Sequence, residues 1–127
     1  MNILGELVTV LQNGNIGTAG STLFIDDIPA EINKAYMVRL SSSLPMDIHI
    51  PVITPAIQIF HRAPNSQQAI EGLYDVITLL HTFEEQTWGT IDVMQCQCVS
   101  EPQFLIKDDN NRVTYSTTFQ LYIRWEQ

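Results

Sequence analysis

The feature that most constrains this fold is an alternation of mostly apolar with polar residues from position 113 to position 125. The odd positions carry Val113, Tyr115, Thr117, Phe119, Leu121, Ile123 and Trp125, and the even positions carry Thr114, Ser116, Thr118, Gln120, Tyr122 and Arg124. Because successive side chains of a β-strand point to opposite faces, this pattern predicts one long half-buried strand. A second strand candidate, Phe104-Leu105-Ile106-Lys107, and the turn-forming residues 108–111 come just before it, so we expect a β-hairpin here.

The length of this strand is informative because the chain is short. Residues 113–125 at ~3.3 Å each span ~43 Å, whereas a compact chain of 127 residues has a diameter of roughly 36 Å. The strand must therefore bend or extend beyond the body of the domain. A projecting strand with aromatic residues needs a neighbour, which favours assembly over catalysis.

The composition indicates one soluble domain that spans residues 1–127. Apolar residues make up 45% of the chain and charged residues 16%, and 14 acids outnumber 6 bases to give a net charge of −8. Phosphate contacts need a basic surface, so this balance disfavours a nucleic-acid-binding protein. The first residues lack the basic region of a signal peptide, and no apolar run has the length of a membrane span. We therefore expect a protein made in a reducing cytosol.

Local patterns predict two helices and several strands. Apolar residues recur at helical spacing over residues 2–12, and Asn65-Ser66 caps a second helix that runs to Leu80 or Phe83. Further strands are expected at 22–25, 35–40, 56–62, 90–99 and 104–107. Within 90–99 the apolar residues change parity, which predicts either a β-bulge or burial on both faces.

The longest stretch without a regular pattern covers residues 41–55. It contains three prolines, which lack a backbone donor, but also several apolar residues. We expect a long projecting loop or hairpin that docks on another surface. The fold class predicted from these elements is α+β, with a mainly antiparallel β-sheet and two α-helices packed on one face.

No cluster in the sequence has the spacing of a catalytic or metal site. The three histidines are scattered, and the serines at 41–43 lack a nucleophile motif. Cys96 and Cys98 leave the four-ligand set of a structural zinc ion incomplete, which favours two reduced thiols packed as small apolar residues. The acidic pairs stand beside turns, where carboxylates serve as caps. We therefore predict no catalytic residue, no metal and no cofactor, and a protein that is not an enzyme.

The N-terminal helix and three further segments resemble a known family. The three segments are residues 16–24 followed by Pro29, residues 55–63 followed by the second helix, and residues 102–109 followed by the strand at 115–123. In this order the chain resembles the small tail terminator proteins of long-tailed bacteriophages, which are also called tail-to-head joining or minor capsid proteins. The likeness covers nearly the whole chain.

The resemblance implies a virion protein of the tail or neck, assembled in the host cytoplasm without a membrane. Such proteins form a closed ring, typically a hexamer, that stops polymerisation of the tail tube and faces the head connector. The implied partners are further copies of the chain, the tail tube protein and a head-completion or stopper protein. Double-stranded DNA passes through the lumen without specific binding.

On this hypothesis two sets of residues are candidates for function. Inter-subunit contacts are expected from Tyr122, Arg124, Trp125, Ile48 and Ile50. Acids of the lumen are expected among Asp26, Asp27, Glu84, Glu85, Asp108 and Asp109, because an acidic channel does not grip sliding DNA. Two alternatives stay open: another head–tail connector component (stopper or adaptor) or a tail tube subunit, and a small ligand-binding domain or enzyme.

Overall fold

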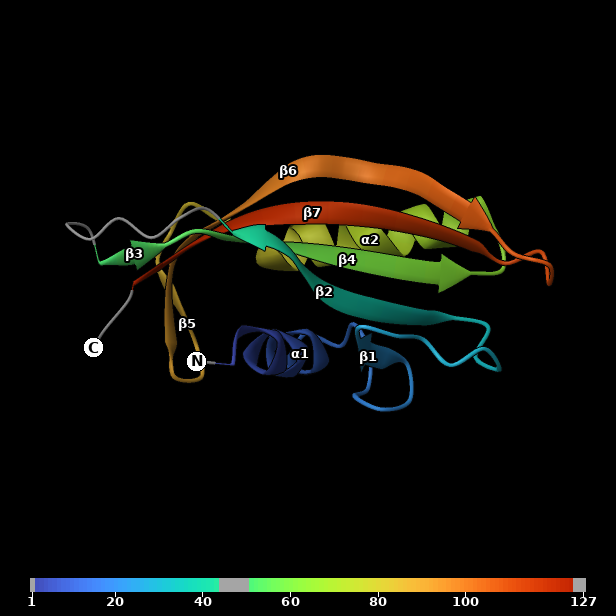
Figure 1. The fold of residues 1–127 in the computed structure, drawn as a ribbon, viewed down its shortest axis with the longest axis horizontal. Helices are drawn as coiled ribbons and strands as arrows, with labels where there is room; N and C mark the ends of the chain where they lie inside the picture. Colours follow the sequence, from blue (N-terminus) through green and yellow to red (C-terminus); the bar gives the residue numbers. More distant parts are fainter. Residues whose placement is uncertain (1, 44–50, 125–127) are drawn as a thin grey trace.

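The computed structural model describes residues 2–43 and 51–124 of the chain, and Figure 1 shows their fold. In chain order the elements are α1 (Ile3–Asn13), β1 (Leu23–Ile25), β2 (Ala35–Ser43), β3 (Val52–Ile53), β4 (Pro55–Ala63), α2 (Ser66–Leu80), β5 (Gln86–Trp88), β6 (Ile91–Lys107) and β7 (Val113–Arg124). The sheet has the strand order β1-β2-β4-β7-β6-β5, and the short β3 pairs with the end of β7. Only β1 and β2 pair in parallel among these strands, so the predicted α+β class with a mainly antiparallel sheet is confirmed.

The long alternating strand is β7, which pairs with β4 on one side and with β6 on the other. A tight turn joins it to β6. The Asp108 carboxylate accepts hydrogen bonds from the backbone N–H groups of Asn110 and Arg112, and Asn111 takes the left-handed conformation that asparagine tolerates (φ 62°). The expected hairpin is confirmed, and Figure 1 shows that it curves along the length of the molecule.

Strand β6 is longer than expected. The prediction of two separate strands at 90–99 and 104–107 was wrong, because β6 runs without interruption over 17 residues. Its register against β7 shifts between Ser100 and Gln103, which leaves Pro102 out of the ladder. The strand therefore continues past a residue that has no N–H to donate. A further shift between Val93 and Gln95 confirms the bulge predicted from the change of parity.

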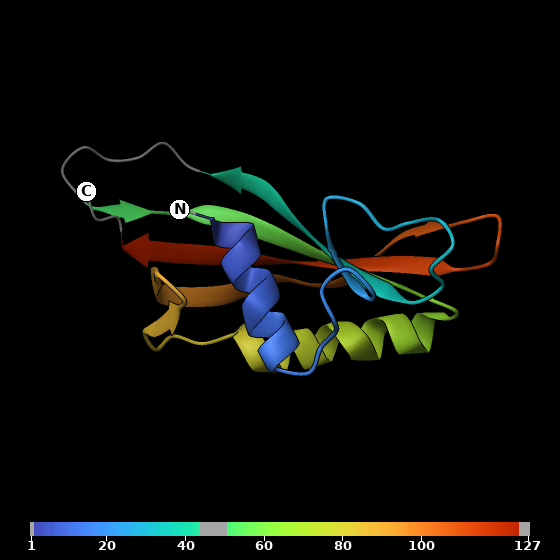
Figure 2. The same cartoon turned by 90° about the horizontal axis from the view of Figure 1, so that it is seen from below.

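One face of the sheet carries the hydrophobic core. Ile57 and Ile59 of β4 are buried there beside Phe119, Leu121 and Ile123 of β7. Both helices add side chains to the same cluster: Leu7 and Leu11 from α1, and Leu73, Val76 and Leu80 from α2. Two helices on one face were predicted, and this is confirmed. Figure 2 shows that α1 lies across the strands whereas α2 runs along them.

Asparagine side chains cap both helices. Asn2 Oδ1 accepts the backbone N–H of Gly5, and Asn65 Oδ1 accepts that of Gln68. A cap of this kind contributes about 1 kcal/mol to helix stability. The second helix ends at Leu80, the earlier of the two expected ends.

A close contact joins the middle of α2 to the sheet. The imidazole of His61 (β4) stacks on the Tyr36 ring (β2) with centroids 3.9 Å apart, and its Nδ1 lies 3.1 Å from the carbonyl oxygen of Ala69. Gly72 faces both rings, and a Cβ at this position would overlap them. Burial lowers the pKa of His61 to about 4. Burial, assisted by Asp75, raises the pKa of Tyr36 to about 12.

The stretch 41–55 is less irregular than expected. Strand β2 continues to Ser43, β3 covers two residues and Pro55 begins β4, so the prediction was wrong at both ends of the stretch. Pro55 is tolerated because the first residue of a strand need not donate to the ladder. Ser43 pairs with Pro55, which brings the two ends side by side as in a hairpin. The tip, with Ile48 and Ile50, lies outside the described residues.

Candidate functional site: the free edges of the sheet

The outer edge of β6 is covered over its first half. Residues 91–93 pair with β5. Further along, the backbones of Thr82 and Cys96 exchange hydrogen bonds, and His81 Nδ1 accepts the N–H of Cys98 at 2.9 Å. These contacts satisfy backbone polar groups of the edge as far as Cys98.

From Val99 onward, none of the described strands pairs with this edge. We call residues 99–107 the open edge. It carries four large apolar side chains that are 53–57% exposed, namely Val99, Phe104, Leu105 and Ile106. Phe104 packs edge-to-face on Tyr115 of β7, with ring centroids 5.7 Å apart. An unpaired strand edge with exposed apolar side chains is a surface to which a strand of another chain adds.

The opposite side of the sheet has a second free stretch. Strand β1 pairs with β2 at Tyr36, Met37 and Val38 and then turns away. Residues 39–43 of β2 pair with β4, but on their other side no described strand joins them. Leu40 in this stretch is 46% exposed. Among the residues that the structure describes, the sheet therefore has one free stretch of edge on each of its two sides.

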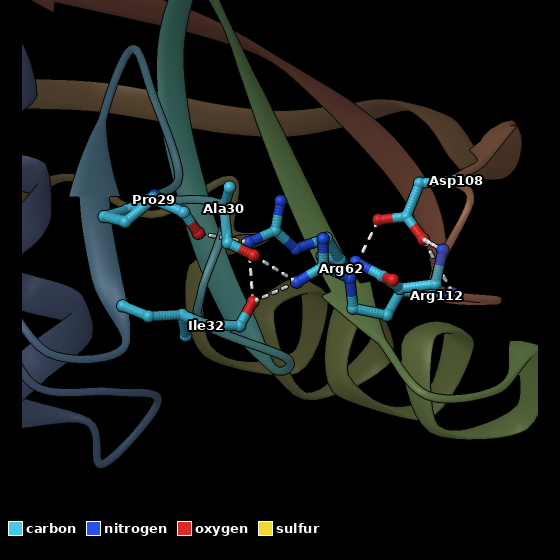
Figure 3. A network of polar contacts seen from close by, with 7 residues as sticks. Pro29, Ala30, Ile32, Arg62, Asp108 and Arg112 are labelled. Carbon is cyan, nitrogen blue, oxygen red and sulfur yellow. Dashed lines mark hydrogen bonds and ion pairs between the residues drawn. The ribbon is translucent and has the colours of Figure 1, made fainter.

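Two arginines hold the loop between β1 and β2 against the end of the sheet where the β6–β7 turn lies (Figure 3). Arg62 Nη2 donates to the carbonyl oxygens of Pro29 and Ile32 at 2.6 and 2.5 Å. Arg112 Nη1 donates to the same Ile32 oxygen at 3.1 Å and to that of Ala30 at 2.6 Å. Hydrogen bonds from charged donors contribute about 1.5–3 kcal/mol each. They fix the loop relative to the hairpin that carries the open edge.

Arg112 also forms an ion pair with Asp108, one of the acids expected in the lumen. Arg112 is buried, and its Nε lies 2.8 Å from Asp108 Oδ2. Desolvation, which raises the pKa of Asp108, is outweighed by hydrogen bonds from Arg112 and Asn110, so this pKa lies below its usual value. Burial, and then the nearby charge of Arg112, lower the pKa of Arg62. Asp108 therefore has a structural role in the turn.

The six acids expected in the lumen lie in three separate places. Asp108 and Asp109 occupy the β6–β7 turn at one end of the sheet. The Glu84-Glu85 pair lies between α2 and β5, and Glu85 Oε1 is 3.2 Å from Arg124 Nη2 at the other end of β7. The Asp26-Asp27 pair follows β1, where the Asp26 N–H donates to the carbonyl oxygen of Val38, level with Thr117 in the middle of β7. The structure thus does not bring these acids together.

The expected contact residues are described only in part. Tyr122 is partly buried on β7, opposite Gln95 of β6. Arg124 is exposed at the end of the strand and forms the ion pair with Glu85. Trp125, Ile48 and Ile50 lie outside the described residues. A contact through these five residues stays a prediction.

The described residues contain no group of three or more metal-binding side chains. None of their helices is long and apolar enough to cross a membrane. Cys96 and Cys98 are free thiols, and burial raises the pKa of Cys96 to about 12, as for a thiol packed in the core. A surface cavity of about 270 Å³ is lined by Ile16, Thr22, Lys34, Ala35 and Tyr36, with one charged side chain among them. The open edge is the stronger candidate site.

Comparison with known families agrees with a role in assembly. The family model described as bacteriophage tail terminator protein matches residues 10–125, which is almost the entire chain. The chain belongs to the bacteriophage tail terminator family. It is therefore a structural component of a phage tail, as the resemblance implied. No protein of curated function matches this tail terminator.

The open edge is the feature that was missed in the sequence, although part of its signal was present. A half-buried strand alternates, so the uninterrupted run Phe104-Leu105-Ile106 indicates apolar side chains on both faces. The absence of a partner strand beyond Val93 depends on the length of β5, which is only three residues. Pattern alone does not show which side of a strand stays unpaired.

Proposed function

We propose that this tail terminator assembles into a closed ring, hexameric as the resemblance implies, that ends the tail tube and joins it to the head connector. The observation that carries the proposal is the open edge, and membership of the family supports the place in the tail. The partners are further copies of the chain, the tail tube protein and a head-completion or stopper protein. Assembly takes place in the host cytoplasm, and DNA passes through the lumen of the finished neck.

The two free edges suit a ring because they lie on opposite sides of one sheet. If the open edge of one copy pairs with residues 39–43 of the next, the contact is heterologous, and repeating the same rotation closes a ring. The open edge lies level with residues 113–118 of β7, whereas residues 39–43 lie level with 118–121. Neighbouring sheets are then staggered along the strands, as closure of a sheet with tilted strands requires.

The open edge is long enough for a specific contact. Its residues, 99–107, span ~30 Å at ~3.3 Å each. Main-chain hydrogen bonds along such an edge give affinity, and the side chains give specificity. Burying the exposed half of each large apolar side chain contributes about 1 kcal/mol.

Replacing both Leu105 and Ile106 by glutamate is expected to abolish rings and leave the single chain folded. Both side chains are more than half exposed, so each change is expected to alter the free energy of unfolding of the single chain by no more than ~0.5 kcal/mol. In the contact, each glutamate would bury a carboxylate without a partner. Native mass spectrometry would measure the oligomeric state, and electron microscopy of purified tail tubes would measure their capping.

Phe83→Glu is the matched control, because Phe83 is 63% exposed but lies outside the open edge. This variant is expected to form rings and to cap tubes as the wild type does. If the Leu105→Glu/Ile106→Glu variant assembled as the wild type does, the open edge would be excluded as the contact between subunits. A wild-type chain that stays monomeric at every concentration and leaves tubes uncapped would overturn the ring itself.

The end of β7 is the second proposed contact, with Tyr122 and Arg124 as its described members. Arg124→Ala is expected to weaken ring formation by about tenfold, as loss of an interface arginine does. Glu85→Ala removes the same exposed ion pair within the chain and is the control. Dilution series followed by mass photometry would compare the two. Equal effects of both changes would assign the loss to the ion pair and leave Arg124 without a role between subunits.

A tail tube subunit is the alternative that the free edges also permit. A heterologous contact whose rotation does not close gives an open filament, and the free edges alone do not fix the rotation. The two cases differ in mass, since a terminator stops at one ring whereas a tube subunit forms a series of growing polymers. A stopper or adaptor would bind the head connector and leave free tubes uncapped.

A further inference from the structure

The face of the sheet turned away from the helices carries mainly neutral polar side chains. Even positions of β7 lie on this face, and residues paired directly with them on β4 and β6 share it. Glutamines and hydroxyl residues form the larger part, and we call the following set the amide face: Gln58, Gln95, Gln97, Gln103, Gln120, Ser100, Thr114, Ser116 and Thr118. The same pairing also places Ala56, Phe60, Arg62, Ile106 and Tyr122 on this side of the sheet.

Two amides of this face, those of Gln58 and Gln120, form hydrogen bonds. Gln58 Nε2 donates to Ser116 Oγ at 3.4 Å. Gln120 Nε2 lies 2.8 Å from the carbonyl oxygen of Thr54 and 3.2 Å from that of Pro55. These contacts hold the Gln58 and Gln120 side chains in place where β4 and β7 pair.

Charged groups are engaged or lie elsewhere. The Arg39 guanidinium, opposite Gln58, lies 6.0 Å from the centroid of the Phe60 ring, and Arg62 donates to the loop carbonyls. Between Thr114 and Tyr122 of β7, no described residue paired on this face carries a carboxylate. The acids at 84–85 and 108–109 lie at the ends of the sheet, Asp26 lies beside Val38 on the β1 side, and Glu101 is exposed in the β6 bulge outside the ladder. The residues paired along the middle of this face thus present few charges.

We propose that the amide face is the wall of the DNA channel, an inference that rests on the ring proposed above. A ring closed through sheet edges is a barrel, so one face of the sheet turns inward. With four long strands from each of six copies it would have about 24 strands, more than the 16–18 strands of porins, which already leave an aqueous channel. The other face carries both helices, each about 10–12 Å across, which would narrow the lumen if they pointed inward.

A neutral wall suits a polyanion that must slide. Each cation that neutralises a phosphate strengthens binding and so adds to the barrier against movement. Amides and hydroxyls offer weaker, water-mediated contacts that exchange as the duplex moves. The acids at 84–85 and 108–109, at the two ends of the sheet, then lie at the two mouths of the channel, where they repel the backbone of the DNA from the rim.

Adding cations to the amide face tests this inference in assembled phage particles. Gln97→Lys/Thr118→Lys places two cations per chain on the face. Gln67→Lys/Thr78→Lys makes the same two changes at exposed positions of α2 and is the control. Ring formation would be measured by native mass spectrometry, and DNA ejection from purified particles by release of a dye-bound genome at several salt concentrations.

The Gln97→Lys/Thr118→Lys particles are expected to form normal rings and to eject DNA at least about tenfold more slowly at low salt, with the difference shrinking as salt rises. The α2 variant is expected to eject at the wild-type rate. Equal rates for the two variants would overturn the inference and leave the ring intact. Loss of rings in the amide-face variant alone would assign this face to a protein contact and overturn it as well. Absence of wild-type rings would instead overturn the proposed function.

Discussion

Replacing Gly72 by alanine is expected to lower the free energy of unfolding by about 2 kcal/mol. The new Cβ would overlap the His61 ring and the Tyr36 hydroxyl, both held in place by stacking and burial. Overpacking of this kind costs about 1–3 kcal/mol, and displacing His61 from the Ala69 carbonyl costs about 1 kcal/mol more. Alanine has a better helix propensity than glycine, but this offsets only about 1 kcal/mol of the loss. Urea denaturation would measure the difference, which corresponds to a melting temperature lower by ~8 °C.

Gly5→Ala is the matched control, since it makes the same change inside the other helix. There the added Cβ would meet only the side chain of Asn2, which can turn towards solvent. Loss of that cap and the gain in propensity nearly cancel, so a change within ~0.5 kcal/mol is expected. Tyr36→Phe removes the hydroxyl that the new Cβ would overlap. It is therefore expected to lower the free energy of unfolding less in the Gly72→Ala background than in the wild type. Strictly additive effects of the two changes would exclude overlap as the cause.

The elements that sequence predicted well are those whose signal is local. Thirteen alternating positions predicted β7, and the pairing of Phe119 with Ile57 shows the buried parity facing the helices. The shift of parity after Val93 predicted the bulge, because each extra residue in a strand reverses the face of those that follow. Asn65 predicted the start of α2 through a hydrogen bond that depends on its own sequence neighbours.

The features that escaped prediction depend on contacts across the sheet. Strands β3 and β5 have two and three residues, too few to show a period. The continuity of β6 past Pro102 depends on β7, which holds the strand on both sides of the bulge. Likewise, the open edge exists because β5 is short, and the separation of the pairs at 84–85 and 108–109 follows from the length of β7. Sequence placed those acids in turns correctly but did not indicate at which end of the sheet each turn lies.

Acid is expected to destabilise the fold through His61, by about 2 kcal/mol between pH 7 and pH 5 and about 3 kcal/mol at pH 4. Its pKa is about 4 in the folded chain against the ordinary 6.5. The unfolded chain therefore binds the proton first, and stability present above pH 6.5 is lost as the pH falls through 4. The geometry gives the cause. A carbonyl only accepts, so Nδ1 donates to Ala69, and protonation would occur at Nε2, which is buried without a hydrogen-bond partner. Urea denaturation at each pH would measure the effect.

His61→Phe tests this assignment, because phenylalanine preserves the stacking on Tyr36 and does not titrate. Between pH 7 and pH 5, the free energy of unfolding of this variant is expected to fall by about 2 kcal/mol less than that of the wild type. The wild type and His61→Phe share the same 14 acids, and the carboxylate contribution therefore cancels when their curves are compared. Parallel curves for wild type and His61→Phe would mean that the buried imidazole does not resist protonation. In that case the contact between α2 and β4 would have to open more readily than its burial indicates.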